Sequence, residues 1–299
     1  MKVLITGGAG FIGSHLAEEL VHQKHKVTVL DNLSSGNLKN LQLIRKKIKF
    51  IKCDISKNKN LAKLLKNVDY IFHLAGLIEV VESFNNPNKY YRVNVGGTLN
   101  LLKALRKVQV KKFIYAASAS CYGNSKKIKV SENSIIETLS PYALTKWLGE
   151  MLVMQWVKTY DLRAISLRFF NIYGSRAKNS GSYSSVINVF IKQKLTKKPY
   201  TIVGDGKQTR SFVHVSDVVN AMIKAAKSKL SGEIFNIGAE KSVQIKEIAT
   251  ILKGKKIYIP KRFGELKYSS ADIRKVKRLL KWKPKITLQT GLRQMLKKI

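Results

Sequence analysis

The fold is decided by the opening stretch Lys2-Val3-Leu4-Ile5-Thr6-Gly7-Gly8-Ala9-Gly10-Phe11-Ile12-Gly13. Its β-branched run predicts a strand over 2–6, and the apolar spacing after the glycines predicts a helix over 11–22. Gly7 allows a tight turn, Gly10 lets the backbone approach a pyrophosphate, and Gly13 lets helix and strand pack closely. The N–H groups and the dipole at the start of such a helix bind phosphate, so the stretch predicts a dinucleotide site.

An acidic residue at the end of the second predicted strand indicates which dinucleotide is bound. Asp31 follows the apolar run 26–30. A carboxylate at this place binds both hydroxyls of the adenosine ribose and repels a 2′-phosphate. No arginine follows Asp31 directly, so the pattern favours NAD over NADP. Asp54 and Ile55, after the third predicted strand, are candidates for a clamp on the adenine.

Strands and helices alternate through the first half of the chain. Strands are predicted at 2–6, 26–30, 49–52, 70–74, 112–116 and 164–168, and helices at 11–22, 61–66, 91–107 and 141–160. This alternation predicts an α/β fold with a doubly wound parallel (Rossmann) sheet. We expect an NAD-binding domain over 1–169 and a smaller, mixed α/β substrate lobe over 170–299, with segments near 211–238 rejoining the first domain.

The composition is that of a globular protein. The chain has 299 residues, 44% apolar and 25% charged, which argues against a disordered chain. No apolar run reaches the length of a membrane span, so no membrane association is expected. Cys53 and Cys121 form no CxxC or CxxH pattern, so neither a metal site nor a disulfide is expected, and the pattern fits a cytoplasmic protein.

The formal net charge of +38 is unusual. Such an excess attracts polyanions and can cause nonspecific binding of nucleic acid. The lysines are spread over the whole chain, however, and no basic tail or RNA-binding signature accompanies them. The distribution favours a lysine-rich surface, and nucleic acid is not the expected partner.

Tyr142 and Lys146 are the first catalytic candidates. Pro141 is typical of a first helical turn, and residues four apart lie on one helix face. A nearby ammonium stabilises a phenolate, so the spacing predicts a lowered pKa for Tyr142 and a role as a base. The strand 112–116 leads into Ser118 and Ser120, hydroxyls expected at the carboxyl edge of the sheet, where such folds bind ligands.

Taken together, the motifs resemble the extended short-chain dehydrogenase/reductases, and in particular the NAD-dependent nucleotide-sugar epimerase/dehydratase family. The resemblance runs nearly end to end. It rests on residues 6–13, Asp31-Asn32, His73-Leu74-Ala75-Gly76, Asn94-Val95-x-Gly97-Thr98, Ser118-x-Ser120-x-Tyr122-Gly123, Tyr142-x-x-x-Lys146, Arg168-Phe169-Phe170-Asn171-x-Tyr173-Gly174, Gly204-Asp205-Gly206-x-x-x-Arg210, His214-Val215-x-Asp217-Val218 and Gly264-Glu265.

The resemblance implies a role for each matching position. Tyr142 is the implied acid/base and Lys146 its partner and a ribose ligand; Ser118 hydrogen-bonds the sugar oxygen, with Ser120 the less favoured choice. The implied contacts to NAD are Gly7, Gly10, Phe11, Ile12, Gly13, Asp31, Asn32, Asp54, Ile55, Leu74, Ala75, Asn94, Tyr142, Lys146 and Phe169. The implied contacts to the substrate are Ser118, Asn171, Val186, Val203, Arg210, Arg262, Glu265 and Ser269, with the arginines suited to the diphosphate.

The residues after Ser118 bear on the reaction. Related dehydratases carry an Asp-Glu pair where this chain has Ala119 and Ser120, and related decarboxylases usually carry Glu at position 120. The resemblance therefore implies 4-epimerisation of a UDP-sugar, UDP-glucose or UDP-galactose. Ser269 replaces a bulky aromatic residue and favours acceptance of the N-acetylated sugars as well. Ile78, often Lys in the 4-epimerases, is a departure that removes one contact.

Two other functions stay open at this point. One is a net oxidoreductase such as a 4-keto-sugar reductase, which usually prefers NADPH; Asp31 argues against it. The other is a basic binding protein on a retained Rossmann scaffold, and the intact Ser118, Tyr142 and Lys146 argue against that.

A homodimer is also expected. The helices predicted at 91–107 and 141–160 carry apolar residues that the relatives pair into a four-helix bundle between subunits. These residues are Leu101, Leu102, Leu105, Trp147, Met151 and Trp156.

Overall fold

A computed structural model describes residues 1–125, 129–177, 186–260 and 268–297. The chain forms two compact units, each made of separate segments of sequence. The first unit comprises Met1–Cys121, Thr138–Arg168 and Val219–Phe235, and the second comprises Tyr122–Glu137, Phe169–Val218 and Asn236–Ile299. Of the segment 211–238, residues 219–235 thus belong to the first unit and the remainder to the second.

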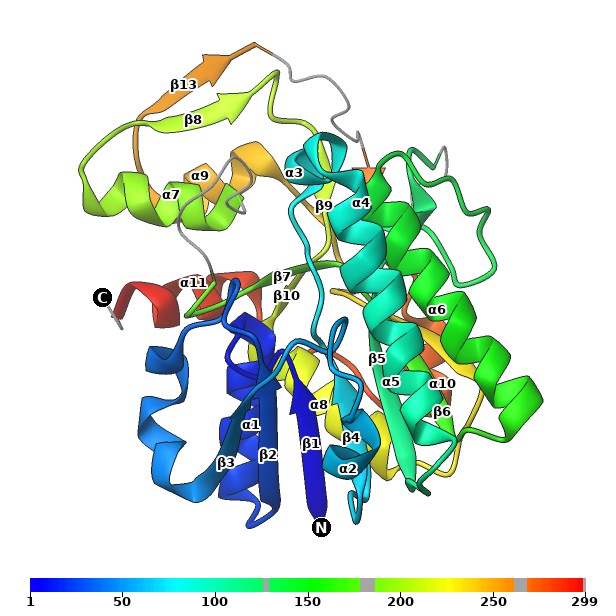
Figure 1. Cartoon of the computed structure of the whole chain (residues 1–299). Helices are drawn as coiled ribbons and strands as arrows, with labels where there is room; N and C mark the ends of the chain where they lie inside the picture. Colours follow the sequence, from blue (N-terminus) through cyan, green and yellow to red (C-terminus); the bar gives the residue numbers. More distant parts are fainter. Residues whose placement is uncertain (126–128, 178–185, 261–267, 298–299) are drawn as a thin grey trace. The chain divides into compact units, whose positions relative to one another are not determined.

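A seven-stranded sheet organises the first unit (Figure 1). Its strands are β1 (Lys2–Thr6), β2 (Lys26–Asp31), β3 (Ile48–Lys52), β4 (Tyr70–His73), β5 (Lys112–Ser118), β6 (Ala164–Phe169) and β11 (Glu233–Ile237). Their order is β11-β6-β5-β4-β1-β2-β3. The strand order reverses between β1 and β4, whose pairing is parallel. The predicted doubly wound parallel sheet is confirmed.

Helices cover both faces of this sheet. They are α1 (Phe11–His22), η1 (Leu38–Lys47), α2 (Leu61–Leu65), α3 (Val80–Asn85), α4 (Pro87–Tyr90), η2 (Tyr91–Gly96), α5 (Gly97–Leu105), the short η3 (Ala119–Tyr122), α6 (Pro141–Tyr160) and α8 (Val215–Lys227). The sequence predicts α1 and α6 with these bounds. The predicted helix 91–107 is instead a π-helical turn, η2, followed by α5.

The leucines of α5 belong to the core of the unit. Leu101, Leu102 and Leu105 are buried in a cluster with Phe113 and Tyr115 of β5. They therefore cannot form an intersubunit face, and this part of the sequence prediction is wrong. Amphipathic spacing shows that a helix has an apolar face but does not show which neighbour covers it.

The second unit contains shorter elements, and its described residues form three small sheets. Its strands are β7 (Asn171–Tyr173), β8 (Tyr200–Val203), β9 (Thr209–Arg210), β10 (Phe212–His214), β12 (Val243–Gln244), β13 (Lys256–Ile259) and β14 (Tyr268–Ser269). Its helices are α7 (Val186–Leu195), α9 (Ile245–Leu252), α10 (Arg274–Leu279) and α11 (Leu288–Lys297). The predicted strand at 211–214 pairs with β7 here, whereas the strand at 235–237 joins the large sheet as part of β11.

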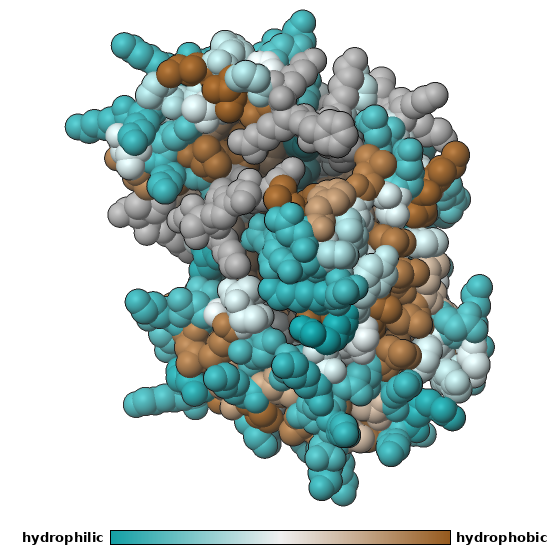
Figure 2. Space-filling model, turned by 45° about the horizontal axis from the view of Figure 1, so that its top comes forward, coloured by the Kyte–Doolittle hydropathy of each residue, from teal (hydrophilic) through white to brown (hydrophobic). Residues whose placement is uncertain are grey.

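Within the described ranges, no helix is both long and apolar enough to cross a membrane. Figure 2 shows hydrophilic side chains over most of the visible face, with brown apolar patches between them.

Candidate active site

The glycine turn after β1 has a geometry that side chains would obstruct. Gly7 has a φ of +71°, and a Cβ there would lie 2.7 Å from the amide nitrogen of Ala75. A Cβ on Gly13 would lie 2.3 Å from the carbonyl oxygen of Gly7. Helix α1 begins after Gly10 without a side-chain cap and without an acidic residue in its first turn. Its first N–H groups have no acceptor within the helix and suit a diphosphate.

Asp31 lies beside this turn at the carboxyl end of β2. Its carboxylate accepts hydrogen bonds from the amides of Ala9 (3.0 Å) and Leu33 (2.8 Å). Burial raises the pKa of Asp31, and the two amides act in the opposite direction. Nearby, the Asn32 amide donates to Asp54 at 3.4 Å. The Asp31 carboxylate fits the ribose diol that the sequence predicts it to bind, and the role of Asp54 in an adenine clamp stays a prediction.

The loop after β4 reaches the same turn. The amide of Leu74 donates to the carbonyl of Thr6 (3.1 Å), and the amide of Ala75 donates to the Thr6 hydroxyl (3.2 Å). Both loops thus meet where the strand order reverses, which is where open α/β sheets bind ligands. NAD fits this arrangement, because the glycines carry no side chains that would obstruct the turn, the start of α1 has no side-chain cap, and the Asp31 carboxylate lies beside the turn.

Helix α6 presents Tyr142 to the end of β5. The helix begins at Pro141 because Ser140 is extended and its hydroxyl caps the amide of Ala143 at 3.1 Å. In the first turn, the Tyr142 hydroxyl donates to Ser118 Oγ at 3.1 Å. Ser118 is the last residue of β5, and the two residues predicted as acid/base and sugar ligand are therefore in direct contact.

Lys146 lies on the same helix and is buried. Its ammonium lies 4.6 Å from the centre of the Tyr115 ring, a cation–π contact. The Tyr115 hydroxyl also donates to the carbonyl of Lys146 at 3.2 Å. Burial lowers the pKa of Lys146 to about 8, and the Glu150 carboxylate acts in the opposite direction.

The predicted lowering of the pKa of Tyr142 is wrong for this structure. Burial raises the pKa of Tyr142 above its ordinary value, and hydrogen bonds from Ser118 and Ser120 offset part of that effect. The i,i+4 spacing to Lys146 indicates an attractive charge but carries no information about lost solvation. The phenol is protonated at neutral pH and is a hydrogen-bond donor.

Asn94, in η2, hydrogen-bonds both the loop after β4 and helix α6, close to Tyr142 and Lys146. Its side-chain oxygen accepts from the amide of Leu77 (2.8 Å), and its amide group donates to the carbonyl of Leu77 (3.1 Å) and to Thr145 Oγ1 (3.0 Å). Thr145 precedes Lys146 on α6. Asn94 therefore fixes the loop after β4 against the helix that carries the catalytic candidates.

The second unit brings together two of the predicted substrate residues. Ser269 of β14 pairs with Arg210 of β9 in parallel register, and the amide of Ser211 donates to the Ser269 carbonyl at 2.8 Å. Asn171 begins β7, Val186 begins α7, Val203 ends β8, and Phe169 is buried at the end of β6. Arg262 and Glu265 lie outside the described residues, and Ile55 is buried in the core of the first unit.

Comparison with known proteins assigns the family. A model of the NAD dependent epimerase/dehydratase family matches residues 3–238. The chain belongs to this family. It is 34% identical to the UDP-glucose 4-epimerase of Mycolicibacterium smegmatis over 303 residues, covering 98% of this chain and 96% of that protein. It is also 35% identical to a UDP-N-acetyl-α-D-glucosaminuronate decarboxylase of Bacillus cytotoxicus, with 98% and 96% covered.

Solved structures show the same fold. The UDP-glucuronic acid 4-epimerase of Bacillus cereus, in complex with UDP-glucuronic acid and NAD, has a TM-score of 0.91 and 33% identity, with 99% of this chain and 98% of that chain covered. The predicted family, fold and cofactor class are thereby confirmed. Since both epimerases and a decarboxylase are similar to the chain, family membership alone does not fix the reaction.

Two buried networks near the site involve contacts of Glu150 and of His73 that the sequence motifs do not predict. Arg168 donates to both carboxylate oxygens of Glu150, at 3.1 and 3.0 Å from Nε, and Ser166 donates to the same carboxylate at 2.8 Å. His73 bridges Thr6 (2.8 Å) and Thr98 (2.9 Å), and burial lowers its pKa to about 3, so it is neutral. Glu150 follows Lys146 by one helical turn, which is the signal that could have found it.

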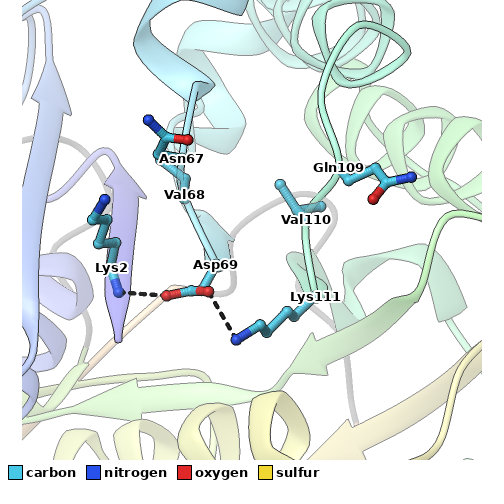
Figure 3. A pocket seen from close by; sticks show the side chains of 7 residues that line it. All are labelled: Lys2, Asn67, Val68, Asp69, Gln109, Val110 and Lys111. Atoms are coloured by element: carbon cyan, nitrogen blue, oxygen red, sulfur yellow. Dashed lines mark hydrogen bonds and ion pairs between the residues drawn. The ribbon is translucent and has the colours of Figure 1, made fainter.

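A pocket of about 440 Å³ lies elsewhere, among the segments that precede the strands (Figure 3). There Asp69 pairs with Lys111 at 3.0 Å and accepts the backbone amide of Lys2 at 2.7 Å. Parallel sheets bind their ligands at the opposite, carboxyl ends, and we assign no role in the reaction to this pocket. Its lining residues are Lys2, Asn67, Val68, Asp69, Gln109, Val110 and Lys111.

Proposed function

We propose that this chain is an NAD-dependent 4-epimerase of UDP-sugars. The observation that carries the proposal is the contact of Tyr142 with Ser118 at 3.1 Å, next to Ala119 and Ser120. Neither of these two residues can move a proton as a carboxylate does. The site therefore supports oxidation and reduction at one carbon, and positions 119 and 120 supply no acid/base pair for elimination.

Each residue of the site has a separate role in the proposed reaction. Ser118 orients the sugar O4, and Tyr142 takes the O4 proton and later returns it. NAD, held by the glycine turn and Asp31, would supply reversible hydride transfer at C4, and its positive charge would favour the phenolate form of Tyr142. Lys146 adds a second positive charge below its pKa of about 8. The 4-keto sugar would rotate about its diphosphate link, so that the hydride returns to the opposite face of C4. Because Tyr142 also returns the proton, the net result is inversion at C4 without net oxidation.

Ser269 supports a substrate range that includes N-acetylated sugars. A serine beside Arg210 in the small sheet takes less room than an aromatic side chain would. We propose UDP-glucose and UDP-galactose as substrates, with UDP-GlcNAc and UDP-GalNAc accepted as well. In Ser269→Tyr, turnover of UDP-GalNAc should fall at least ten-fold while turnover of UDP-galactose is retained. Equal losses for both sugars would contradict the role of Ser269.

NMR of the protein with UDP-galactose and catalytic NAD tests the function. We expect conversion to the 4-epimer without net NADH. Tyr142→Phe should lose about 10²- to 10⁴-fold in rate, as removal of an acid/base does, while still binding NAD. Net consumption of NADH with a 4-keto sugar would instead identify a reductase. A fully active Tyr142→Phe would exclude the mechanism.

We also propose a homodimer that uses the outer face of α6. Trp147 and Met151 remain half-buried there. Trp156 donates to the carbonyl of Leu102 at 3.2 Å and so packs within its own chain. Light scattering at micromolar concentration should give twice the mass of 33.8 kDa; a monomer would contradict the assignment.

A further inference from the structure

The turn after β5 brings a second hydroxyl to Ser118. Strand β5 ends at Ser118, and η3 begins at Ala119, so the chain folds back within two residues. Ser120 Oγ then donates to Ser118 Oγ at 2.8 Å, and the Ser120 amide donates to the same oxygen at 3.2 Å. Serine hydroxyls commonly accept a bond from the amide two residues later in such turns. The second bond, between the two hydroxyls, is not needed for the turn.

The hydrogen bonds at Ser118 restrict where its own proton points. A hydroxyl has one donor hydrogen and two acceptor lone pairs. Ser118 Oγ accepts from the Ser120 hydroxyl, from the Ser120 amide and from the Tyr142 hydroxyl. These three donors compete for two acceptor positions, so both positions are filled, and the Ser118 proton is left for a fourth group.

The same arrangement matters when Tyr142 is a phenolate. The phenolate cannot donate, so Ser118 must donate to it to keep the contact. Ser120 still donates to Ser118 in that state, and a hydroxyl that accepts a bond becomes a stronger donor. The Ser120 hydroxyl thus supports Ser118 as a donor in both protonation states of Tyr142.

We propose that Ser120 is a positioning residue: its hydroxyl directs the single Ser118 proton toward the sugar oxygen while Tyr142 is protonated, and toward the Tyr142 phenolate once that proton is lost. The part that concerns the sugar rests on the proposed function; the part that concerns Tyr142 does not. Hydrogen bonds of Tyr142 with Ser118 and with Ser120 lower the pKa of Tyr142, so Ser120 also acts on the phenol directly. A carboxylate at position 120 would accept from Ser118 and reverse the direction of the bond.

The other titratable groups near Tyr142 do not obscure the effect of Ser120 on the titration of Tyr142. Burial raises the pKa of Cys121 to about 12 and also raises that of Tyr115 above its ordinary value. Both are therefore neutral near pH 8. Lys146 titrates in that range, but its pKa is set by burial and by Glu150, so substitutions at Ser120 leave its titration in place.

Two measurements on the NAD-loaded protein test the proposal. The first follows phenolate absorbance at 295 nm against pH, with Tyr142→Phe subtracted to remove the other tyrosines. The second is the acidic limb of kcat/KM against pH with UDP-galactose. In Ser120→Ala, both midpoints should rise by about one pH unit, the size expected for one hydrogen bond to a charged group. Turnover below the midpoint should then fall about ten-fold.

Ser120→Thr keeps the hydroxyl and is the matched control; it should restore both midpoints. Ser120→Cys, with a weaker donor of similar size, should give intermediate values and replaces Ser120→Ala if that variant does not fold. Unchanged midpoints in a Ser120→Ala protein of unaltered melting temperature would overturn the proposal. If the unmodified protein does not convert UDP-galactose, the proposed function fails, and the 295 nm titration still decides the role of Ser120.

Discussion

Replacing Lys146 by methionine should stabilise the protein while it abolishes activity. Lys146 is buried, and burial lowers its pKa from 10.5 to about 8. A shift of this size corresponds to about 3 kcal/mol of destabilisation at neutral pH. The cation–π contact with Tyr115 offsets about 1 kcal/mol of it. A methionine side chain would fill the same space without a charge, for a net gain of about 2 kcal/mol.

The gain in stability should depend on pH. Below pH 8 the lysine is protonated in both states, and the folded chain carries the full unfavourable term. Between pH 8 and 10.5 only the unfolded chain keeps the proton, so the stability of the unmodified protein rises with pH. The advantage of Lys146→Met should therefore be largest below pH 8 and should shrink toward pH 10.5.

Thermal melts followed by circular dichroism at about pH 7 and about pH 9.5 measure this difference. For a chain of 299 residues, about 2 kcal/mol corresponds to a rise in Tm of about 3 °C. Lys158→Met, an exposed position on the same helix, is the matched control for replacing a lysine by methionine. A Lys146→Met protein that melts below the unmodified one at neutral pH, or a gap that does not change with pH, would refute the reasoning.

Two further substitutions test the buried ion pair and the cofactor preference. Arg168→Met leaves the Glu150 carboxylate buried without its partner and should destabilise the fold by about 3–5 kcal/mol in urea denaturation. The double variant Glu150→Met, Arg168→Met should recover most of that loss. Equal losses of stability in the single and the double variant would show that the pair itself is stabilising. Asp31→Ser should weaken NAD binding and narrow the preference for NAD over NADP in calorimetric titrations, because the carboxylate that repels a 2′-phosphate is removed. An unchanged ratio of the two affinities would show that Asp31 does not select the cofactor.

Local signals explain which parts of the structure could be predicted from the sequence. The glycines after β1 and the Ser140-Pro141 start of α6 specify their structure within a few residues, so the predicted ranges 11–22 and 141–160 match the structure. The family motifs then place Tyr142 beside Ser118, and the structure shows this contact.

The features that could not be predicted depend on packing between distant segments. The contact of Lys146 with Tyr115 requires α6 to lie over β5, and the pKa of Tyr142 depends on how much solvent that packing removes. The pairing of β10 with β7 rather than with the large sheet likewise results from tertiary contacts. Spacing along a helix predicts neighbours on one face, but it does not predict the partners across an interface.

The π-helical turn η2 makes the position of Asn94 sensitive to chain length. Such turns carry one residue more than an α-helix would over the same rise, and Asn94 lies within it. Deletion of a single residue would allow a regular helix, in which the flanking residues keep their faces but the residues inside the turn, Asn94 among them, change direction. Asn94 and the helix start at Gly97 could then no longer both keep their places. Insertions and deletions between 91 and 96 should therefore be tolerated far less than substitutions at the exposed positions of the same turn.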